Sequence, residues 1–211
     1  MDPKQIVADG YDYIAEQHEK WASNIRVAER TKYTNVLLEK LPKGAKVLEL
    51  GCGSGLPTTE QLAKKFAVTG VDISAQQIAL AQQKIPVVQF IHADMTKLDF
   101  PKGSFDAVTA FYSIIHVPRQ EHANLLSKIA SWLRPGGLLV ITMGANSIET
   151  QLNENWLGGL PMYWSNFDSE TNRRLVEETG LNILSAIDET ADEFEKPVTF
   201  LWVIAQKPDA T

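Results

Sequence analysis

Short apolar segments alternate with amphipathic segments through the middle of the chain. The apolar segments end in polar or small residues, as buried strands do. The segments between them carry apolar residues at helical spacing, and Ser74 is positioned to cap one of them. This alternation predicts a parallel sheet with helices on both faces and ligands at the carboxyl ends of its strands. The predicted strands cover residues 45–50, 67–73, 87–93, 105–113 and 138–144, and the predicted helices cover residues 57–66, 74–84 and 120–133.

The two ends of the chain depart from this alternation. Residues 3–41 read as helical, with a break near Ser23, and residues 144–167 form a long irregular stretch. A helix that stops at Gly180 follows, and two strands around the acidic loop Glu189–Lys196 predict an antiparallel hairpin. The sequence therefore predicts a single domain over residues 1–211. Its parts are a helical cap (1–41), a core (44–144), an insertion (145–167), and a C-terminal helix with a hairpin (168–211).

Composition narrows the class of protein without naming a ligand. A chain of 211 residues suits one domain. Its net charge of −6 argues against binding nucleic acid or an anionic membrane through bulk charge. The single cysteine excludes an intrachain disulfide, and the sequence shows neither a signal peptide nor a membrane-spanning run. We therefore expect a cytoplasmic protein, and no metal, because no cluster of His, Cys, Asp or Glu has a recognisable ligand spacing.

The stretch KVLELGCGSGLPTTEQLA, residues 46–63, carries glycines at every second position from 51 to 55. Glycine permits positive φ and a close approach of ligand to backbone, and the N-terminus of the following helix favours electron-rich groups. A dinucleotide fingerprint would require glycine at the position of Leu56, so a nicotinamide-dependent dehydrogenase is nearly excluded. Glu49 would repel a pyrophosphate and attract an ammonium group. We therefore predict a ligand that carries an amino group.

Two further acids end the next two predicted strands. Asp72 lies about twenty residues beyond the glycines, where a carboxylate can accept hydrogen bonds from both hydroxyls of a ribose. Asp94 ends the third strand, where a carboxylate can accept from an adenine amino group while Ile73 or Met95 packs against the ring. Acids at the ends of three consecutive strands therefore predict an adenosine-containing ligand.

These segments resemble the class I S-adenosylmethionine-dependent methyltransferases. VLELGCGSG, GVDIS, IHADMTKLDFPKGSFDAVTAFYSIIHVP and WLRPGGLLVIT match the successive motifs of that family in order, over roughly residues 44–144. The resemblance implies S-adenosylmethionine as cofactor. It also implies a Rossmann-like α/β fold with seven strands in the order 3-2-1-4-5-7-6, of which strand 7 is antiparallel. The residues that the resemblance assigns to the cofactor are Tyr13, Glu49, Gly51, Cys52, Gly53, Gly55, Asp72, Ile73, Asp94, Met95, Ala110 and Phe111.

The reaction that this resemblance implies is transfer of a methyl group, which depends mainly on proximity and orientation. His116 follows the fourth strand and is the candidate general base, if the acceptor must lose a proton. The alternative is a histidine that packs or hydrogen-bonds beneath the cofactor site. Tyr13 resembles an aromatic residue that closes over the cofactor and is a second catalytic candidate. AFYS at residues 110–113 lacks the [DN]PP[YF] pattern of members that methylate bases or glutamine amides, which argues against those acceptors.

The aromatic insertion, residues 145–167, is the candidate substrate lid, because loops of this length in compact domains are usually functional. It could cover an apolar or aromatic molecule or form a cage for a cation. The alternative is that its aromatic residues cap the core. We expect a small-molecule acceptor methylated at O, N or S, and neither nucleic acid nor a membrane as partner. The residues predicted to contact the acceptor are Trp21, His116, Trp156, Met162, Tyr163 and Trp164.

Two other functions stay open at this point. The chain could use the sulfonium for cyclisation or lysis instead of methylation, or it could bind the cofactor as a regulatory protein without turnover. Product analysis separates the first from a methyltransferase, and a broad acceptor panel separates the second. The sequence specifies neither the acceptor nor the oligomeric state.

Overall fold

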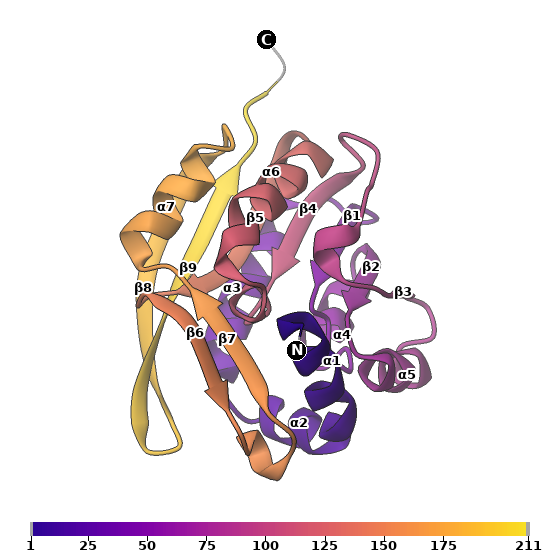
Figure 1. Cartoon of the computed structure of the whole chain (residues 1–211). Coiled ribbons are helices and arrows are strands. Elements are labelled where there is room, and N and C mark those ends of the chain that lie inside the picture. The colour runs from indigo at the N-terminus through magenta and orange to yellow at the C-terminus, as the bar shows by residue number, and fades with distance from the viewer. Residues whose placement is uncertain (1, 210–211) are drawn as a thin grey trace.

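A seven-stranded sheet forms the centre of the computed structural model, which describes residues 2–209 (Figure 1). The strand order is β3-β2-β1-β4-β5-β9-β8, with parallel pairing from β3 to β5. β9 is antiparallel to both β5 and β8. Since β8 and β9 are the sixth and seventh strands of this sheet, the predicted order 3-2-1-4-5-7-6 is confirmed. The strands are β1 Lys46–Leu50, β2 Ala67–Asp72, β3 Gln89–His92, β4 Phe105–Ala110, β5 Leu133–Gly144, β8 Asn182–Glu193 and β9 Lys196–Gln206.

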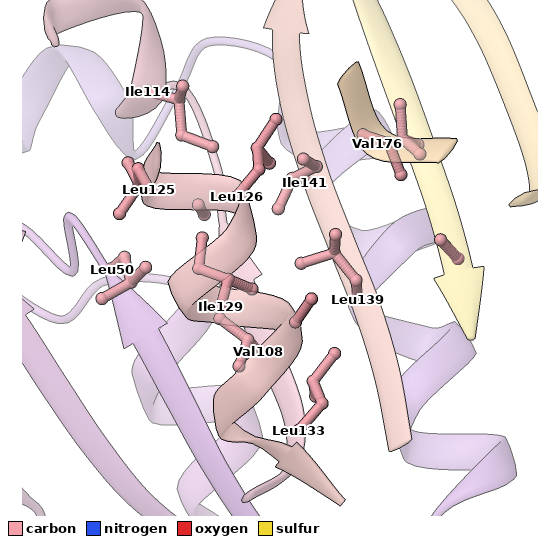
Figure 2. Packing of buried hydrophobic residues seen from close by; sticks show 14 of the residues in the cluster. Leu50, Val108, Ile114, Leu125, Leu126, Ile129, Leu133, Leu139, Ile141 and Val176 are labelled. Atoms are coloured by element: carbon pink, nitrogen blue, oxygen red, sulfur yellow. The ribbon is translucent and has the colours of Figure 1, made fainter. Parts of the chain in front are cut away.

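Helices cover both faces of this sheet because alternate side chains of each strand point to opposite sides. Leu48 of β1 lies in the same hydrophobic cluster as residues of α6 and α7, whereas Val47 clusters with residues of α3 and α4. Figure 2 shows the first cluster, in which Leu125 and Ile129 of α6 lie against the sheet. The helices that accompany this sheet are α3 Val27–Lys40, α4 Thr58–Ala63, α5 Ala75–Lys84, α6 His122–Trp132 and α7 Ser169–Glu177.

The N-terminal region contains three helices where the sequence predicts two segments. α1 (Pro3–Tyr13) and α2 (Ala15–Ala22) precede α3, and the additional break lies at Ile14, whose φ of −103° and ψ of 15° are not helical. The predicted break near Ser23 is present. α1 lies beside α5 and beside the strand β7 (Met162–Asn166) of the insertion. The N-terminal region therefore covers the end of the sheet where the parallel strands terminate (Figure 1).

The insertion is a folded β-hairpin, which corrects the predicted irregular stretch. β6 (Ile148–Asn153) pairs with β7 (Met162–Asn166) in a separate two-stranded sheet. β6 is mostly exposed and polar, so it lacks the apolar alternation that signals a strand. β7 packs closely on α1, since a Cβ on Gly10 would lie 2.9 Å from Cε of Met162. Short single-turn helices complete the chain: η1 Met95–Lys97, η2 Ile114–His116, η3 Arg119–Glu121 and η4 Trp156–Gly158.

The C-terminal pair of strands is antiparallel, as predicted, but its connection is much shorter than the predicted acidic loop. Pairing between β8 and β9 continues to Glu193 and Lys196. Only Phe194 and Glu195 form the turn, and both have positive φ, at 52° and 61°. Two such residues make a tight hairpin turn that matches the twist of the strands. The tip of this long hairpin lies at the same end of the molecule as α2, where Phe194 stacks on Trp21 (Figure 1).

Candidate cofactor and acceptor site

One cavity of about 800 Å³ opens where the parallel strands end. The loops after these strands form its floor, and α1 to α3, the β6–β7 hairpin and the tip of the β8–β9 hairpin form its walls. This volume lies within the range of small-molecule sites, about 300–1,000 Å³. The predicted site residues that line the cavity are Trp21, Glu49, Gly51, Cys52, Gly53, Asp72, Ile73, Asp94, Met95, Phe111, His116, Trp156 and Trp164.

The three glycines after β1 have different roles. A Cβ on Gly51 would lie 2.2 Å from Cβ of Ser113, so this glycine allows the loop after β4 to pack against the loop after β1. A Cβ on Gly55 would lie 2.7 Å from Cδ1 of Ile85, and Gly55 is not among the cavity residues, so its assignment to the cofactor stays a prediction. At Gly53, with φ of 55°, no atom lies nearer than 3.8 Å to such a Cβ. Gly53 therefore presents bare backbone to the cavity.

Two buried carboxyl groups flank Gly53. Asp72 accepts hydrogen bonds from the backbone N–H groups of Gly53 (2.8 Å) and Ser74 (2.9 Å). Burial raises the pKa of Asp72, and these backbone donors oppose that shift. Glu49 accepts a hydrogen bond of 2.6 Å from the hydroxyl of Thr59, and burial raises its pKa to about 8. Because burial penalises the ionised form of both acids, a bound cation would stabilise them.

Asp94 interacts with the first turn of α1. One of its carboxylate oxygens accepts from the backbone N–H (2.9 Å) and hydroxyl (2.8 Å) of Thr96. The other contacts the Lys4 ammonium at 3.0 Å as an ion pair without a well-directed hydrogen bond. Burial opposes ionisation of Asp94, but the Thr96 donors and Lys4 outweigh it and lower the pKa. Lys4 also forms an ion pair with Glu121 at 2.9 Å. The two ion pairs of Lys4 therefore hold the start of α1 at this end of the cavity.

Tyr11, and not the predicted Tyr13, reaches the cavity from α1. Lys4, Val7 and Tyr11 line the cavity, and their spacing places them on one face of the helix. Tyr13 lies outside the cavity with 67% of its surface exposed. The structure therefore favours Tyr11 over Tyr13 at the cavity, and the roles assigned to Tyr13 stay predictions.

His116 is buried and hydrogen-bonded through both ring nitrogens. Its Nδ1 lies 2.7 Å from the backbone carbonyl oxygen of Tyr163, which can only accept, so Nδ1 carries the proton. Its Nε2 lies 2.9 Å from the hydroxyl of Tyr11. Burial lowers the pKa of His116 to about 4, so the imidazole is neutral at pH 7 and Nε2 accepts from Tyr11.

A cluster of aromatic side chains forms the wall of the cavity next to His116. The Trp156 ring makes edge-to-face contacts with Tyr11, Trp21 and Trp164, each with centroids 5.6 Å apart. Trp21 also stacks on Phe194 at the tip of the β8–β9 hairpin, with centroids 5.9 Å apart. Trp156 therefore bridges the N-terminal helices and the β6–β7 hairpin, and its faces are occupied by neighbouring rings instead of forming an open cage.

Three predicted residues do not present their side chains to the cavity. Met162 and Tyr163 are buried in a small cluster with Val7, because α1 covers the start of β7. Tyr163 contributes to the site only through the carbonyl that receives His116 Nδ1–H. Ala110 belongs to the main hydrophobic core. The resemblance assigns Ala110 to the cofactor through its backbone, so this assignment and the acceptor roles of Met162 and Tyr163 stay predictions.

Arg30 is a cavity residue that the sequence analysis missed. Its guanidinium donates to the backbone carbonyls of Ala22 and Ile25 and lies 4.9 Å above the ring of Tyr112. Burial lowers its pKa. Within residues 2–209, no carboxylate lies within ion-pair distance of it, whereas Arg26 contacts both Glu29 and Glu193. In the sequence Arg30 reads as one more polar position on an amphipathic helix, so no signal there distinguishes it.

Metal and membrane features can be assessed for the part of the chain that the structure describes. There, no group of three or more His, Cys, Asp or Glu side chains is arranged to hold a metal ion. Likewise, no helix among residues 2–209 has the length and apolar character needed to cross a membrane. The expectation that the protein uses no metal stays a prediction.

The strand order and the position of the cavity define a Rossmann-like class I methyltransferase fold. A solved structure with this fold, magnesium protoporphyrin IX methyltransferase from Synechocystis with bound S-adenosylmethionine, superposes with a TM-score of 0.70. The alignment covers 98% of each chain at 19% identity, a level of similarity that shows the fold alone.

Sequence comparison identifies the family. Residues 47–137 match the model of a methyltransferase domain. A 27-O-demethylrifamycin SV methyltransferase from Amycolatopsis mediterranei is 31% identical over 64% of this chain and 57% of its own length. A 2-methyl-6-phytyl-1,4-hydroquinone methyltransferase from Synechocystis is 38% identical over 75% of this chain and 47% of its own length. The chain thus spans about half the length of the curated relatives it matches. These comparisons support a class I S-adenosylmethionine-dependent methyltransferase.

Proposed function

We propose that the protein transfers the methyl group of S-adenosylmethionine to a small molecule. The observation that carries this proposal is that one cavity joins Gly53, Glu49 and Asp72 to His116 and the aromatic cluster. Such a cavity offers room for a cofactor at the glycine loop and for an acceptor beside it. The sulfonium supplies an electrophilic methyl group when the cofactor is bound, and the task of the protein is to orient the acceptor and exclude water.

The residues at the glycine loop fit an amino acid joined to a nucleoside. Glu49 is a buried acid suited to an ammonium group, and Arg30 is a partly buried cation without a carboxylate partner among the described residues. We assign Glu49 to the amino group and Arg30 to the carboxylate of the cofactor. Asp72 is assigned to the ribose, and the pair Asp94 and Met95 to the adenine, in line with the family resemblance.

The acceptor side of the cavity favours a small aromatic or apolar molecule with a polar reacting group. Trp21, Trp156 and Trp164 give it aromatic walls, and Asn146 and Asn166 add polar groups nearby. The names of the two curated relatives describe a demethylated rifamycin and a hydroquinone as substrates. Both names are compatible with an aromatic acceptor that carries hydroxyl groups, and this class is the one we propose.

Cofactor binding can be tested before the acceptor is known. Isothermal calorimetry should show binding of S-adenosylhomocysteine and none of NAD, since Leu56 stands where a dinucleotide loop needs glycine. Asp72→Ala should weaken S-adenosylhomocysteine binding by more than about tenfold, because the variant loses the carboxylate that we assign to the two ribose hydroxyls. Asp99→Ala, at an exposed position outside the cavity, is the matched control. Unchanged affinity in Asp72→Ala would refute the ribose assignment.

Methyl transfer itself requires an acceptor panel. We would incubate the protein with radiolabelled S-adenosylmethionine and catechol, benzoate, benzylamine or thiophenol, and identify the products by mass spectrometry. The proposed function predicts a labelled methyl product from at least catechol. Binding of S-adenosylhomocysteine with no methylated product from any panel member would contradict an enzyme of this acceptor class.

A further inference from the structure

Tyr11 and His116 both line the cavity, and the Tyr11 hydroxyl occupies the imidazole nitrogen that could accept a proton. The imidazole donates through Nδ1 to the Tyr163 carbonyl (2.7 Å) and accepts through Nε2 from the Tyr11 hydroxyl (2.9 Å). Both nitrogens are therefore occupied, and an acceptor molecule cannot reach Nε2 without displacing Tyr11. The Tyr11 oxygen, in contrast, uses its proton for His116 and keeps its lone pairs for a further donor.

We propose that Tyr11 is the residue that receives the proton of the acceptor, and that His116 stores this proton behind it. This inference rests on the proposed function and deepens it, because it names the group that contacts the acceptor. A catalytic role for His116 alone, acting directly on the acceptor, does not fit the observed hydrogen bonds. Tyr11 is the catalytic residue in this arrangement, and His116 acts through it.

The step balances in atoms and charge. The acceptor oxygen forms a bond to the methyl carbon while the carbon–sulfur bond breaks and leaves its electron pair on sulfur. The acceptor's O–H proton moves to the Tyr11 oxygen, and the former Tyr11 proton moves to Nε2 of His116. The positive charge that was on sulfur is then on the imidazolium, which later releases the proton to solvent. No oxidant, reductant or further reactant is needed.

Surrounding contacts hold Tyr11 in this position before any ligand binds. Its ring packs edge-on against His18 (centroids 4.8 Å apart) and Trp156 (5.6 Å). The next residue, Asp12, accepts hydrogen bonds from the Ser74 hydroxyl (2.5 Å) and the Gln76 N–H (3.0 Å), which fixes this turn of α1 to the start of α5. A proton-transfer group held this way needs little reorganisation during the reaction.

The electrostatics of Tyr11 and His116 favour a proton relay, in which Tyr11 passes its proton to His116 as it receives the proton of the acceptor. They disfavour a stable Tyr11 phenolate. Burial raises the pKa of Tyr11, and the charge of Asp72 raises it further, so an isolated phenolate is unfavourable there. A relay avoids this species because Tyr11 gives up one proton as it gains another. His116 starts neutral, and because burial lowers its pKa to about 4, it holds the proton only transiently before releasing it to solvent.

The relay also limits the class of acceptor. It is useful only to an acceptor that carries a transferable proton on the reacting atom, such as a phenol or another hydroxyl compound. A tertiary amine or a thioether loses no proton on methylation and gains nothing from it. The acceptor class that follows is a small molecule with a proton on its reacting atom. Among these the hydroxylated class named under the proposed function fits, with its reacting O–H directed at the Tyr11 oxygen.

The hydrogen-bond arrangement can be tested without turnover. In ¹⁵N-labelled protein with S-adenosylhomocysteine bound at pH 7, long-range ¹H–¹⁵N spectra should show His116 protonated at Nδ1 and unprotonated at Nε2. Comparison with His116→Gln assigns the signals among the four histidines of the chain. Tyr11→Phe should shift the Nε2 resonance, and Tyr13→Phe, an exposed tyrosine on the same helix, should not. A proton on Nε2, or no response to Tyr11→Phe, would overturn the proposal.

Kinetics with catechol then tests the proton transfer. Tyr11→Phe should lower kcat by about 10²–10⁴-fold while KM for catechol and the Kd of S-adenosylhomocysteine change less than about threefold. The loss should shrink as the pH approaches the pKa of the catechol, because an ionised acceptor needs no base. His116→Gln keeps hydrogen-bonding groups but cannot store the proton, and the double variant should be no slower than the slower single variant, since the two residues act as a unit.

Two kinetic outcomes would refute the relay. In one, Tyr11→Phe keeps wild-type kcat while His116→Gln loses it, which would make His116 the direct base. In the other, both variants keep wild-type kcat, which would mean that no base is used. Failure of the proposed function looks different, because the wild-type protein would then methylate no panel member at all, while the NMR experiment would still report on the Tyr11–His116 contact.

Discussion

The buried carboxyl group of Glu49 should couple cofactor binding to proton release. With a pKa of about 8, Glu49 is mostly protonated in the free protein at pH 7. An ammonium group bound beside it favours the ionised form, so binding must expel the proton. For a pKa of about 8, roughly 0.9 proton should be released per bound S-adenosylhomocysteine at pH 7. The apparent Kd should then fall by about tenfold from pH 6 to pH 7, which is about 1.4 kcal/mol.

Calorimetry at pH 7 in two buffers with different enthalpies of ionisation measures this proton release directly. Glu49→Gln keeps an acceptor for the Thr59 hydroxyl but cannot ionise, so its binding should release no proton and show no such pH dependence. In the wild type, 5′-methylthioadenosine, which lacks the amino-acid end, should also bind without proton release. Burial lowers the pKa values of His116 and His18 to about 4 and about 3, so neither contributes between pH 6 and 7. Equal proton release by wild type and Glu49→Gln would refute the reasoning.

Two further predictions concern neighbouring parts of the cavity. Arg30→Met should weaken S-adenosylhomocysteine binding by at least about tenfold, because it removes the proposed partner of the ligand's carboxylate. The same variant should bind 5′-methylthioadenosine, which lacks that carboxylate, within about twofold of wild type. Equal losses for both ligands in calorimetry would argue for a general structural role of Arg30. Gly51→Ala should lower the thermal midpoint by several degrees, because its Cβ would lie 2.2 Å from Cβ of Ser113. In the Gly51→Ala/Ser113→Gly double variant only part of this loss should be recovered, because Gly51 has a φ of 76° and the Ser113 hydroxyl donates to the Leu50 carbonyl at 2.7 Å. A fall equal to that of Gly51→Ala alone would show that Ser113 is not the obstacle.

The sheet and the loops at its edge were predictable because their signals are local. Each parallel strand is a short apolar run whose last residue or following loop carries a site group, and pairing in a parallel sheet brings those ends together. Glu49, Asp72 and Gly53 therefore lie together as expected. Gly51 and Gly55 show the limit of this reasoning, since their spacing looks the same as that of Gly53 while their neighbours, Ser113 and Ile85, are distant in sequence.

The walls of the cavity were less predictable because they depend on contacts between distant segments. Tyr11 and Tyr13 lie two residues apart on one helix, and only the packing of α1 against α5 and β7 decides which of them faces inward. β6 was missed because its polar sequence is stabilised by pairing with β7, a contact that hydrophobic periodicity does not report. Trp156 lines the cavity, as expected, but its edge-to-face contacts with other rings could not be read from the sequence.

The charges at the glycine loop explain why a zwitterionic ligand suits this cavity. Glu49 and Arg30 both lie on the cavity, and no ion pair joins them in the described residues, although the charge of Arg30 lowers the pKa of Glu49 against the larger effect of burial. In the free protein Glu49 is therefore mostly protonated, and Arg30 has backbone carbonyls but no carboxylate as partners. An α-amino acid end brings an ammonium group for Glu49 and a carboxylate for Arg30, so it offsets both penalties at once. A ligand with only one of these charges would leave the other side chain without its charged partner, and we expect this difference to favour the complete cofactor over its fragments.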